Sequence, residues 1–122
     1  MSTTTGIDSL RAFLAAQPGA VGEPLPRFPN VTLYKVMRKM FAILTDGKER
    51  HVILKCDPHL AEVLREQYSA VGHRSHLDRR FWISVDIGAD VPDEEIRRLV
   101  AQSYDLVTNN LTRKQKAELA AL

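Results

Sequence analysis

The sequence predicts an α+β fold of two layers, in which an antiparallel sheet carries helices mainly on one face. Three consecutive segments have strand character and are separated by short turns, which is typical of a strand meander. Two strong helix starts follow, at Asp57-Pro58 and at Pro92. Because helices that stand apart from a strand meander favour an antiparallel sheet, we expect the element order α-β-β-β-α-β(β)-α-α.

The N-terminal part is predicted to contain one helix and one loop. Apolar residues at helical spacing predict a helix over Ile7–Ala16, which Gln17-Pro18-Gly19 ends. The segment Gly19–Pro29 contains three prolines and two glycines. We therefore expect this segment to be an ordered loop without regular structure.

Three strands are expected next, over Val31–Met37, Met40–Thr45 and Arg50–Cys56. Asp46-Gly47 is a tight-turn signal between the second strand and the third. In the third strand, the alternation of side chains places Cys56 on an apolar face and puts His51 and Lys55 on the opposite face. The pattern predicts a meander with a basic outer face.

A helix and a strand are predicted after the meander. Asp57 suits the N-cap of a helix and Pro58 suits its first position, so we expect a helix that runs to Tyr68. Phe81–Gly88 alternates strictly between apolar and polar residues, which predicts a strand. A short strand over Arg74–Leu77 is the predicted partner of Phe81–Gly88.

Two further helices are expected at the C-terminal end of the chain. Pro92 opens a long helix whose first turn carries three acidic residues, and these complement the positive end of the helix dipole. Thr112 and Gln115 have the spacing of a capping box for a final short helix. The predicted buried stripe of the long helix is Ile96, Leu99, Val100, Ser103, Tyr104 and Val107.

Length and composition limit the class of protein. With 122 residues, of which 44% are hydrophobic and 26% charged, we expect one domain over residues 1–122 with one core. No apolar run approaches the roughly 18 residues of a membrane span. The single cysteine forms no internal disulfide, which suits a reducing compartment. We therefore expect a cytoplasmic protein that does not associate with a membrane.

Positive charge is concentrated in the middle of the chain. The segment 27–80 contains 11 Lys and Arg against 6 Asp and Glu, a net charge of +5. The segment 81–122 contains 5 against 7, a net charge of −2. This asymmetry permits an anionic partner such as nucleic acid.

A first candidate site joins basic side chains to the only tryptophan. Its residues are Arg74, His76, Arg79, Arg80 and Trp82. Arginines neutralise phosphates and a ring face stacks on an exposed base, so this set indicates DNA binding. In the alternative interpretation, Trp82 packs beneath a helix or loop and the arginines are merely solvated.

A second set of basic residues follows the predicted meander. Its members are Lys35, Arg38, Lys39, Lys48, Arg50 and Lys55. In the DNA-binding interpretation, this set extends the first one across the sheet face. No helix has the character of a recognition helix, so contacts would be mostly to the DNA backbone. Alternatively, Lys and Arg on strands keep sheet edges from pairing with other chains.

Cys56, His59, His73 and His76 are the candidates for metal binding or catalysis. The spacings Cys-x-x-His and His-x-x-His occur in zinc sites, but Cys56 belongs to an apolar strand face and His59 to a first helical turn. A helix start beside Cys56 can lower a thiol pKa, yet no base is fixed near it in the sequence. We expect no metal, no cofactor and no catalytic residue, and therefore a protein that is not an enzyme.

Five short motifs occur in a fixed order along the chain. They are KMFA at 39–42, LKCDP at 54–58, HLDRRFW at 76–82, VPDEE at 91–95 and SYDLV at 103–107. Their order and spacing resemble the MmcQ/YjbR family of small bacterial proteins. The resemblance implies a CyaY-like or secretion-chaperone-like two-layer fold, no metal, and a role usually described as DNA binding. The family often carries glycines before its Lys-Met-Phe, where this chain has Met37-Arg38.

Two classes of partner stay open at this point. One is DNA, and the other is a protein partner, because similar two-layer folds serve as secretion chaperones. A continuous basic face favours DNA, and an exposed apolar patch favours a protein. We expect a monomer or a weak homodimer. A small enzyme would require a deep pocket with convergent polar groups.

Overall fold

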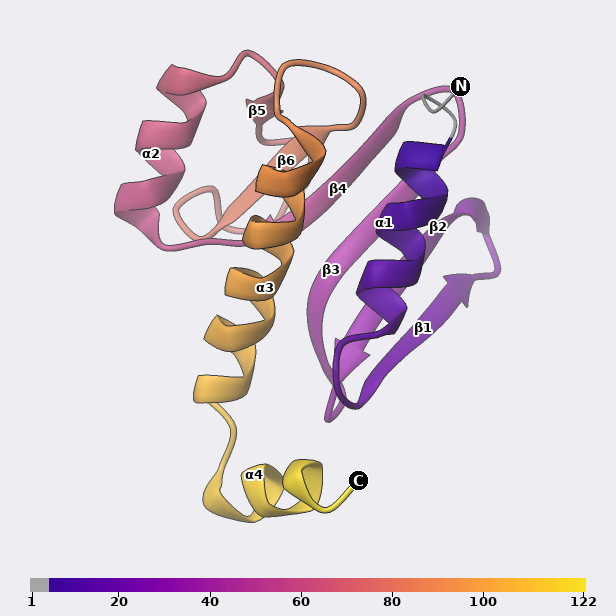
Figure 1. The fold of residues 1–122 in the computed structure, drawn as a ribbon, viewed down its shortest axis with the longest axis vertical. Coiled ribbons are helices and arrows are strands. Elements are labelled where there is room, and N and C mark those ends of the chain that lie inside the picture. The colour runs from indigo at the N-terminus through magenta and orange to yellow at the C-terminus, as the bar shows by residue number, and fades with distance from the viewer. Residues whose placement is uncertain (1–4) are drawn as a thin grey trace.

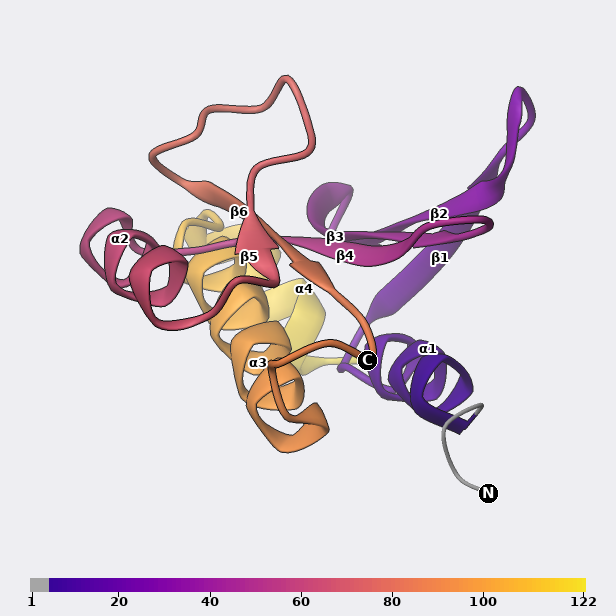
Figure 2. The same cartoon turned by 90° about the horizontal axis from the view of Figure 1, so that it is seen from above.

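An antiparallel sheet of six strands, in the order β1-β2-β3-β4-β6-β5, organises the computed structural model, which describes residues 5–122 (Figure 1). The helices α1 and α3 cross one face of this sheet, and α2 lies beside its β5–β6 edge (Figures 1 and 2). The elements are α1 (Thr5–Ala15), β1 (Ala20–Leu25), β2 (Phe28–Val36), β3 (Lys39–Asp46), β4 (Arg50–Lys55), α2 (Pro58–Gln67), β5 (Val71–Gly72), β6 (Trp82–Asp86), α3 (Asp93–Asn109) and α4 (Arg113–Ala120).

The predicted α+β class, antiparallel sheet and one-sided helices are confirmed. The expected loop over 19–29 is wrong in part, because it contains strand β1, which pairs with β2. The prolines misled the prediction, since proline is tolerated on an edge strand, and Pro24 lies where the register of β1 shifts. The expected short strand over 74–77 is also wrong, since β5 lies earlier, where Val71 pairs with Val85.

The two faces of the sheet differ in composition. Leu44 and Val52 pair across β3 and β4 on the helix-covered face, where both are buried in the main core. On the opposite face, Leu33, Ile43 and Ile53 are paired in one row across β2, β3 and β4. The loop between β5 and β6 rises on this second side (Figure 2). The predicted basic outer face is therefore wrong at its centre, which is apolar.

The turn between β2 and β3 has an unusual backbone. Met37 and Arg38 have φ angles of 48° and 69°, which are left-handed values that non-glycine residues rarely adopt. Two successive positive φ angles are those of a type I′ hairpin turn, which favours Asn-Gly. Glycines, which the family often has near this position, adopt these positive φ angles without strain. In this chain Met37 and Arg38 adopt them, at a steric cost.

Capping signals in the sequence are confirmed at two helix starts. The Asp57 Oδ2 atom accepts hydrogen bonds from the backbone N–H groups of His59 and Leu60, both at 3.1 Å, ahead of Pro58. Thr112 and Gln115 form the complete capping box of α4. In the described part of the chain, no helix is both long and apolar enough to cross a bilayer.

Candidate nucleic-acid interface

The predicted basic residues do not lie on one surface but at two opposite ends of the sheet. The pairing of Lys55 with Trp82 brings the end of β4 to the start of β6. The pairing of His51 with Asp86 marks the opposite end, beside the β3–β4 turn. We name the first the pocket end (residues 37–40, 55–58 and 78–82) and the second the clamped end (residues 46–50, 74 and 86).

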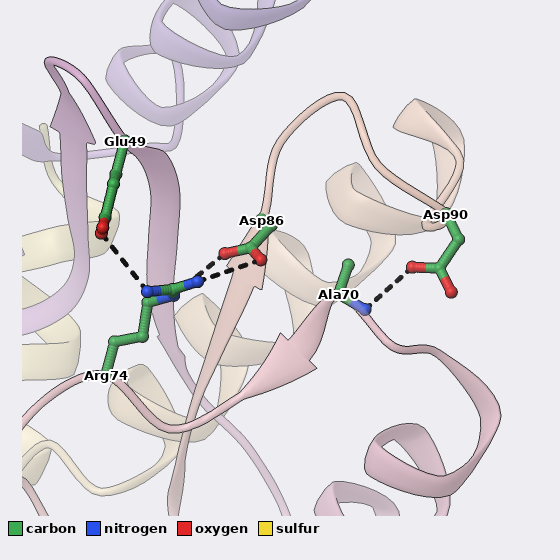
Figure 3. Close-up of polar contacts among 5 residues, drawn as sticks. All are labelled: Glu49, Ala70, Arg74, Asp86 and Asp90. Atoms are coloured by element: carbon green, nitrogen blue, oxygen red, sulfur yellow. Dashed lines mark hydrogen bonds and ion pairs between the residues drawn. The ribbon is translucent and has the colours of Figure 1, made fainter.

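At the clamped end, arginines are neutralised by carboxylates. Arg74 binds Asp86 through Nε at 3.0 Å and Nη2 at 3.2 Å, and binds Glu49 through Nη1 at 3.3 Å (Figure 3). Hydrogen bonding to Asp86 raises the pKa of Arg74. Arg50 pairs with Asp46 at 3.3 Å. Arg74 therefore joins the loop to β6 and to the β3–β4 turn, and the charge it offers to a ligand is largely cancelled.

A second contact holds the same region of the fold. The Asp90 carboxylate, after β6, accepts a hydrogen bond from the backbone N–H group of Ser69 at 2.8 Å. It accepts another from the N–H group of Ala70 at 2.9 Å (Figure 3). The hydrogen bond from Ser69 is the main cause that lowers the pKa of Asp90. The polar groups near this end are thus engaged in linking segments of the chain to one another.

The pocket end has a different balance of charge. Within residues 5–122, no carboxylate oxygen lies within 4.0 Å of the charged nitrogens of four cations. These cations are Arg38, Lys39, Lys55 and Arg79. Arg38, Lys39 and Arg79 are exposed and Lys55 is half-buried. This end therefore presents positive charge that is not cancelled by a neighbour.

The remaining predicted residues have partners or lie apart. Lys35 pairs with Glu23 at 3.0 Å, and Arg80 pairs with Asp78 at 2.8 Å. Hydrogen bonds from the Arg80 side chain and backbone lower the pKa of Asp78 to about 2. His76 is exposed in the β5–β6 loop, and Lys48 is exposed at the clamped end.

The turn before β6 fixes the exposure of Arg79 and Arg80. The Asp78 carbonyl oxygen accepts hydrogen bonds from the N–H groups of Phe81 and Trp82, both at 3.0 Å. The Arg65 Nη2 atom of α2 donates to the carbonyl oxygens of Arg79 at 2.8 Å and Trp82 at 3.1 Å. Because these hydrogen bonds hold the backbone of the turn on the α2 side, the side chains of Arg79 and Arg80 are directed to solvent.

A surface pocket of about 370 Å³ opens at this end, between the strand ends and α3. Trp82 is half-buried and lines this pocket. A neighbouring hollow of about 220 Å³ shares Asp57 and Leu106 with it. The pocket is lined by Lys55, Cys56, Asp57, Pro58, Phe81, Trp82, Leu106 and Asn110.

Sequence reasoning missed Leu106 and Asn110 as lining residues of this pocket. A signal for Leu106 was present, because it is an apolar residue that lies outside the helical stripe predicted to be buried in α3. Asn110 carries no comparable signal, since it follows the end of α3 and reaches the pocket through the tertiary fold.

Cys56 lies in the pocket floor but is poorly suited to chemistry. The residue is 3% exposed, which agrees with its predicted place on the apolar face of its strand. Burial, followed by the nearby Asp57 charge, raises the pKa of the thiol to about 11. A thiol that stays protonated is a weak nucleophile and a weak metal ligand. In the part of the chain that the structure covers, no three potential metal-ligating side chains lie together.

Ser103 connects three of the sequence motifs in space. Its Oγ atom donates a hydrogen bond to the Phe41 carbonyl oxygen at 2.6 Å and accepts one from the Lys55 N–H at 2.9 Å. Ser103 is fully buried, so α3 holds the starting end of β3 to the finishing end of β4. The adjacent Tyr104 ring meets the Phe41 ring edge-on, with centroids 5.5 Å apart. These motif residues build the framework of the pocket end.

The fold and this site define a small α+β protein with an aromatic-lined pocket, which contains both Lys55 and Asp57, at one end of its sheet. The YjbR family model matches residues 15–106, and the chain belongs to the YjbR family. The Escherichia coli (strain K12) protein called uncharacterized protein YjbR is 32% identical over 117 residues, which are 95% of this chain and 98% of that protein. Uncharacterized protein YbdF of Escherichia coli O157:H7 is 25% identical over 92 residues, 75% of each chain.

Solved structures show the same architecture. The crystal structure of Deinococcus radiodurans protein DR2400, described as a DUF419 domain, has a TM-score of 0.83 at 27% identity, over 93% of this chain and 87% of that one. A Pseudomonas syringae protein has a TM-score of 0.70 at 20% identity, over 81% of this chain and 96% of that one. The second likeness concerns the fold alone.

Proposed function

We propose that this protein binds nucleic acid weakly and with little sequence preference through its pocket end. The observation that carries the proposal is that four cations at the sheet end where Trp82 is half-buried have no carboxylate partner in the described residues, namely Arg38, Lys39, Lys55 and Arg79. Cations of this kind attract phosphates and release counterions. The proposed contacts come from strand ends and turns and not from a helix, so base readout contributes little.

Two charge-matched double variants test the proposal. Lys55→Gln with Arg79→Gln removes two unpaired cations from the pocket end, whereas Arg50→Gln with Arg74→Gln removes two cations that are paired with carboxylates at the clamped end. We expect the first variant to weaken binding to unrelated DNA sequences alike. We also expect it to flatten the dependence of log affinity on log salt by about 0.9 for each lost phosphate contact. The second variant should bind nearly as well as the parent.

Two results would contradict the proposal. In one, both double variants lose affinity equally, which means that net charge and not the pocket end determines binding. In the other, the parent shows no binding in low salt by fluorescence anisotropy of labelled DNA. Circular dichroism of each variant is the folding control, because the glutamines replace surface or strand side chains without removing a packed core residue.

A second candidate function, binding of a protein partner, is favoured by a separate observation. Val21 and Phe28 of the β1–β2 hairpin are 57% and 60% exposed, and Phe28 lines a hollow of about 260 Å³ beside the β3–β4 turn. Exposed apolar side chains near a hollow are typical of protein contacts. Phe28→Ser should leave DNA binding unchanged and should abolish partner capture or self-association if this face is the functional one.

A further inference from the structure

The pocket at the end of β4 and β6 has the size and lining of a small-ligand site. Its volume of about 370 Å³ falls at the small end of the range for ligand pockets. We propose that it accepts one unpaired base of a single-stranded nucleic acid, while the surrounding cations bind the flanking phosphates. This inference rests on the proposed function and specifies the form of nucleic acid that the site prefers.

The apolar and aromatic walls favour a flat ring as the occupant. Phe81 and Trp82 lie on the strand side of the pocket, and Leu106 comes from α3. Phe81 is 37% exposed and carries the Arg80 guanidinium 5.2 Å from its ring centroid. Every base has a ring face, and stacking on an aromatic side chain is tolerant of sequence. The walls therefore suit a base without selecting one base strongly.

The polar groups of the pocket favour a base inside and phosphates at the rim. Asp57 uses Oδ2 to accept the two N–H groups at the start of α2. Its Oδ1 atom has no hydrogen-bond partner within residues 5–122, and the Asn110 side chain donates to the Leu106 carbonyl oxygen, which leaves the Asn110 amide oxygen as an acceptor. A carboxylate in the wall repels phosphate, whereas acceptors and the Lys55 ammonium match the donors and acceptors on base edges.

A duplex cannot use this pocket without a cost. A base within a duplex is stacked and paired, and its removal from the stack requires a few kcal/mol, whereas a single strand has its bases available. One stacked base is typically worth enough to change affinity by about tenfold. We therefore expect single-stranded DNA to bind about tenfold more tightly than a duplex of the same sequence in the same salt.

Trp82 provides a direct readout, because it is the only tryptophan in the chain. A short single-stranded oligonucleotide should quench or shift its emission over the same concentration range in which anisotropy of the labelled strand rises. A duplex of that sequence should bind through phosphates and leave the emission nearly unchanged. The matching oligonucleotide with abasic sites keeps every phosphate but lacks bases, and it should bind no more tightly than the duplex.

A pocket-filling variant adds a test on the protein side. Leu106→Phe narrows the pocket without changing charge, and Leu122→Phe makes the same change at a residue that is 84% exposed. We expect Leu106→Phe to lower single-strand affinity to the level of the duplex and to leave duplex binding as it was. Leu122→Phe should behave as the parent. If Leu106→Phe does not fold, the abasic comparison decides the question with the unaltered protein.

The outcomes separate this inference from the function on which it rests. Equal affinity for single strand, duplex and abasic strand would overturn the base pocket and leave backbone binding intact. The base pocket would also be overturned if anisotropy reports binding of the single strand while Trp82 emission stays constant. Absence of binding to all three nucleic acids in low salt would overturn the proposed function itself.

Discussion

The two ends of the sheet contain the same kinds of basic residue but use them differently. At the clamped end, Arg74 contacts Asp86 and Glu49, and Arg50 contacts Asp46. At the pocket end, Arg80 pairs with Asp78, whereas Arg38, Lys39, Lys55 and Arg79 lack such partners in the described residues. The count of Lys and Arg in a segment therefore does not define its electrostatic surface. The placement of carboxylates decides which cations remain available.

The ends also differ in what holds them together. The clamped end is joined by ion pairs whose side chains are partly exposed, for example Arg74 at 43%. The pocket end is joined by Ser103, a buried hydroxyl that bonds to the backbone of β3 and β4. Exposed ion pairs contribute little to stability, because water and salt screen them. A buried backbone group that loses its hydrogen-bond partner lowers the free energy of unfolding more strongly.

The largest expected effect is on stability at the pocket end. Ser103→Ala leaves the Phe41 carbonyl and the Lys55 N–H without their partner and should lower the free energy of unfolding by about 2–3 kcal/mol. Arg74→Gln, at the clamped end, should produce a much smaller change. Urea unfolding at constant pH, followed by circular dichroism, measures both.

A matched control for Ser103→Ala is Ser9→Ala. Ser9 accepts a hydrogen bond from Arg97 at 3.2 Å on the surface, and its loss should change stability by less than about 0.5 kcal/mol. If Arg74→Gln destabilises as much as Ser103→Ala, the two ends are not held by different kinds of contact and this part of the comparison is wrong.

Local signals in the sequence predicted most of the fold. The Asp57 cap and the Thr112 and Gln115 box are confirmed, because a cap depends on residues a few positions apart. Strand β1 was missed, since the tolerance of an edge strand for proline depends on which strand lies beside it. The edge position of β1 follows from the tertiary arrangement.

The candidate site was less predictable than the fold. The cations could be named from the sequence, but Arg74 meets Asp86 across 12 positions and Glu49 across 25. No local pattern predicts these pairings. The pocket joins residues 55–58, 81–82, 106 and 110, and only the fold brings these segments together. The family motifs were informative because they come from segments that meet in space.

An increase in stability, and not a loss, is expected from a substitution at the β2–β3 turn. Arg38→Gly relieves the left-handed backbone at φ 69° and should raise the free energy of unfolding by about 1 kcal/mol. The same change removes one of the cations without a partner, so DNA affinity should fall. Arg38→Ala is the matched control, because it removes the charge and keeps a Cβ atom in the strained conformation. Equal stability of the two variants would show that the turn stores no strain.

The Cys56 thiol gives a pH-dependent effect at the pocket end. Its pKa of about 11 in the folded protein is above its ordinary value of 9.0, so folding favours the protonated form. The resulting stability is fully present below pH 9 and is lost as the pH rises from 9 toward 11. We expect slow native labelling by a thiol reagent at pH 8 and rapid labelling in urea. Rapid native labelling at that pH would show that the thiol is accessible and ionised.

The smallest effect is expected at Asp78, and it distinguishes two adjacent arginines. The folded pKa of Asp78 is about 2, below its ordinary 3.8, because Arg80 donates hydrogen bonds to it. Its contribution to stability is present above pH 3.8 and is lost as the pH falls toward 2. A carboxyl chemical-shift titration should show this midpoint in the parent and a higher one in Arg80→Gln.

The same ion pair predicts unequal roles for the two arginines in binding. The charge of Arg80 is cancelled by Asp78 at 2.8 Å, whereas Arg79 has no carboxylate partner in the described part of the chain. Arg79→Gln should therefore weaken DNA binding more than Arg80→Gln does, although both remove one exposed cation from the same turn. Equal losses in an anisotropy titration would mean that phosphate displaces Asp78 from Arg80, and the contrast between paired and available cations would then fail at this position.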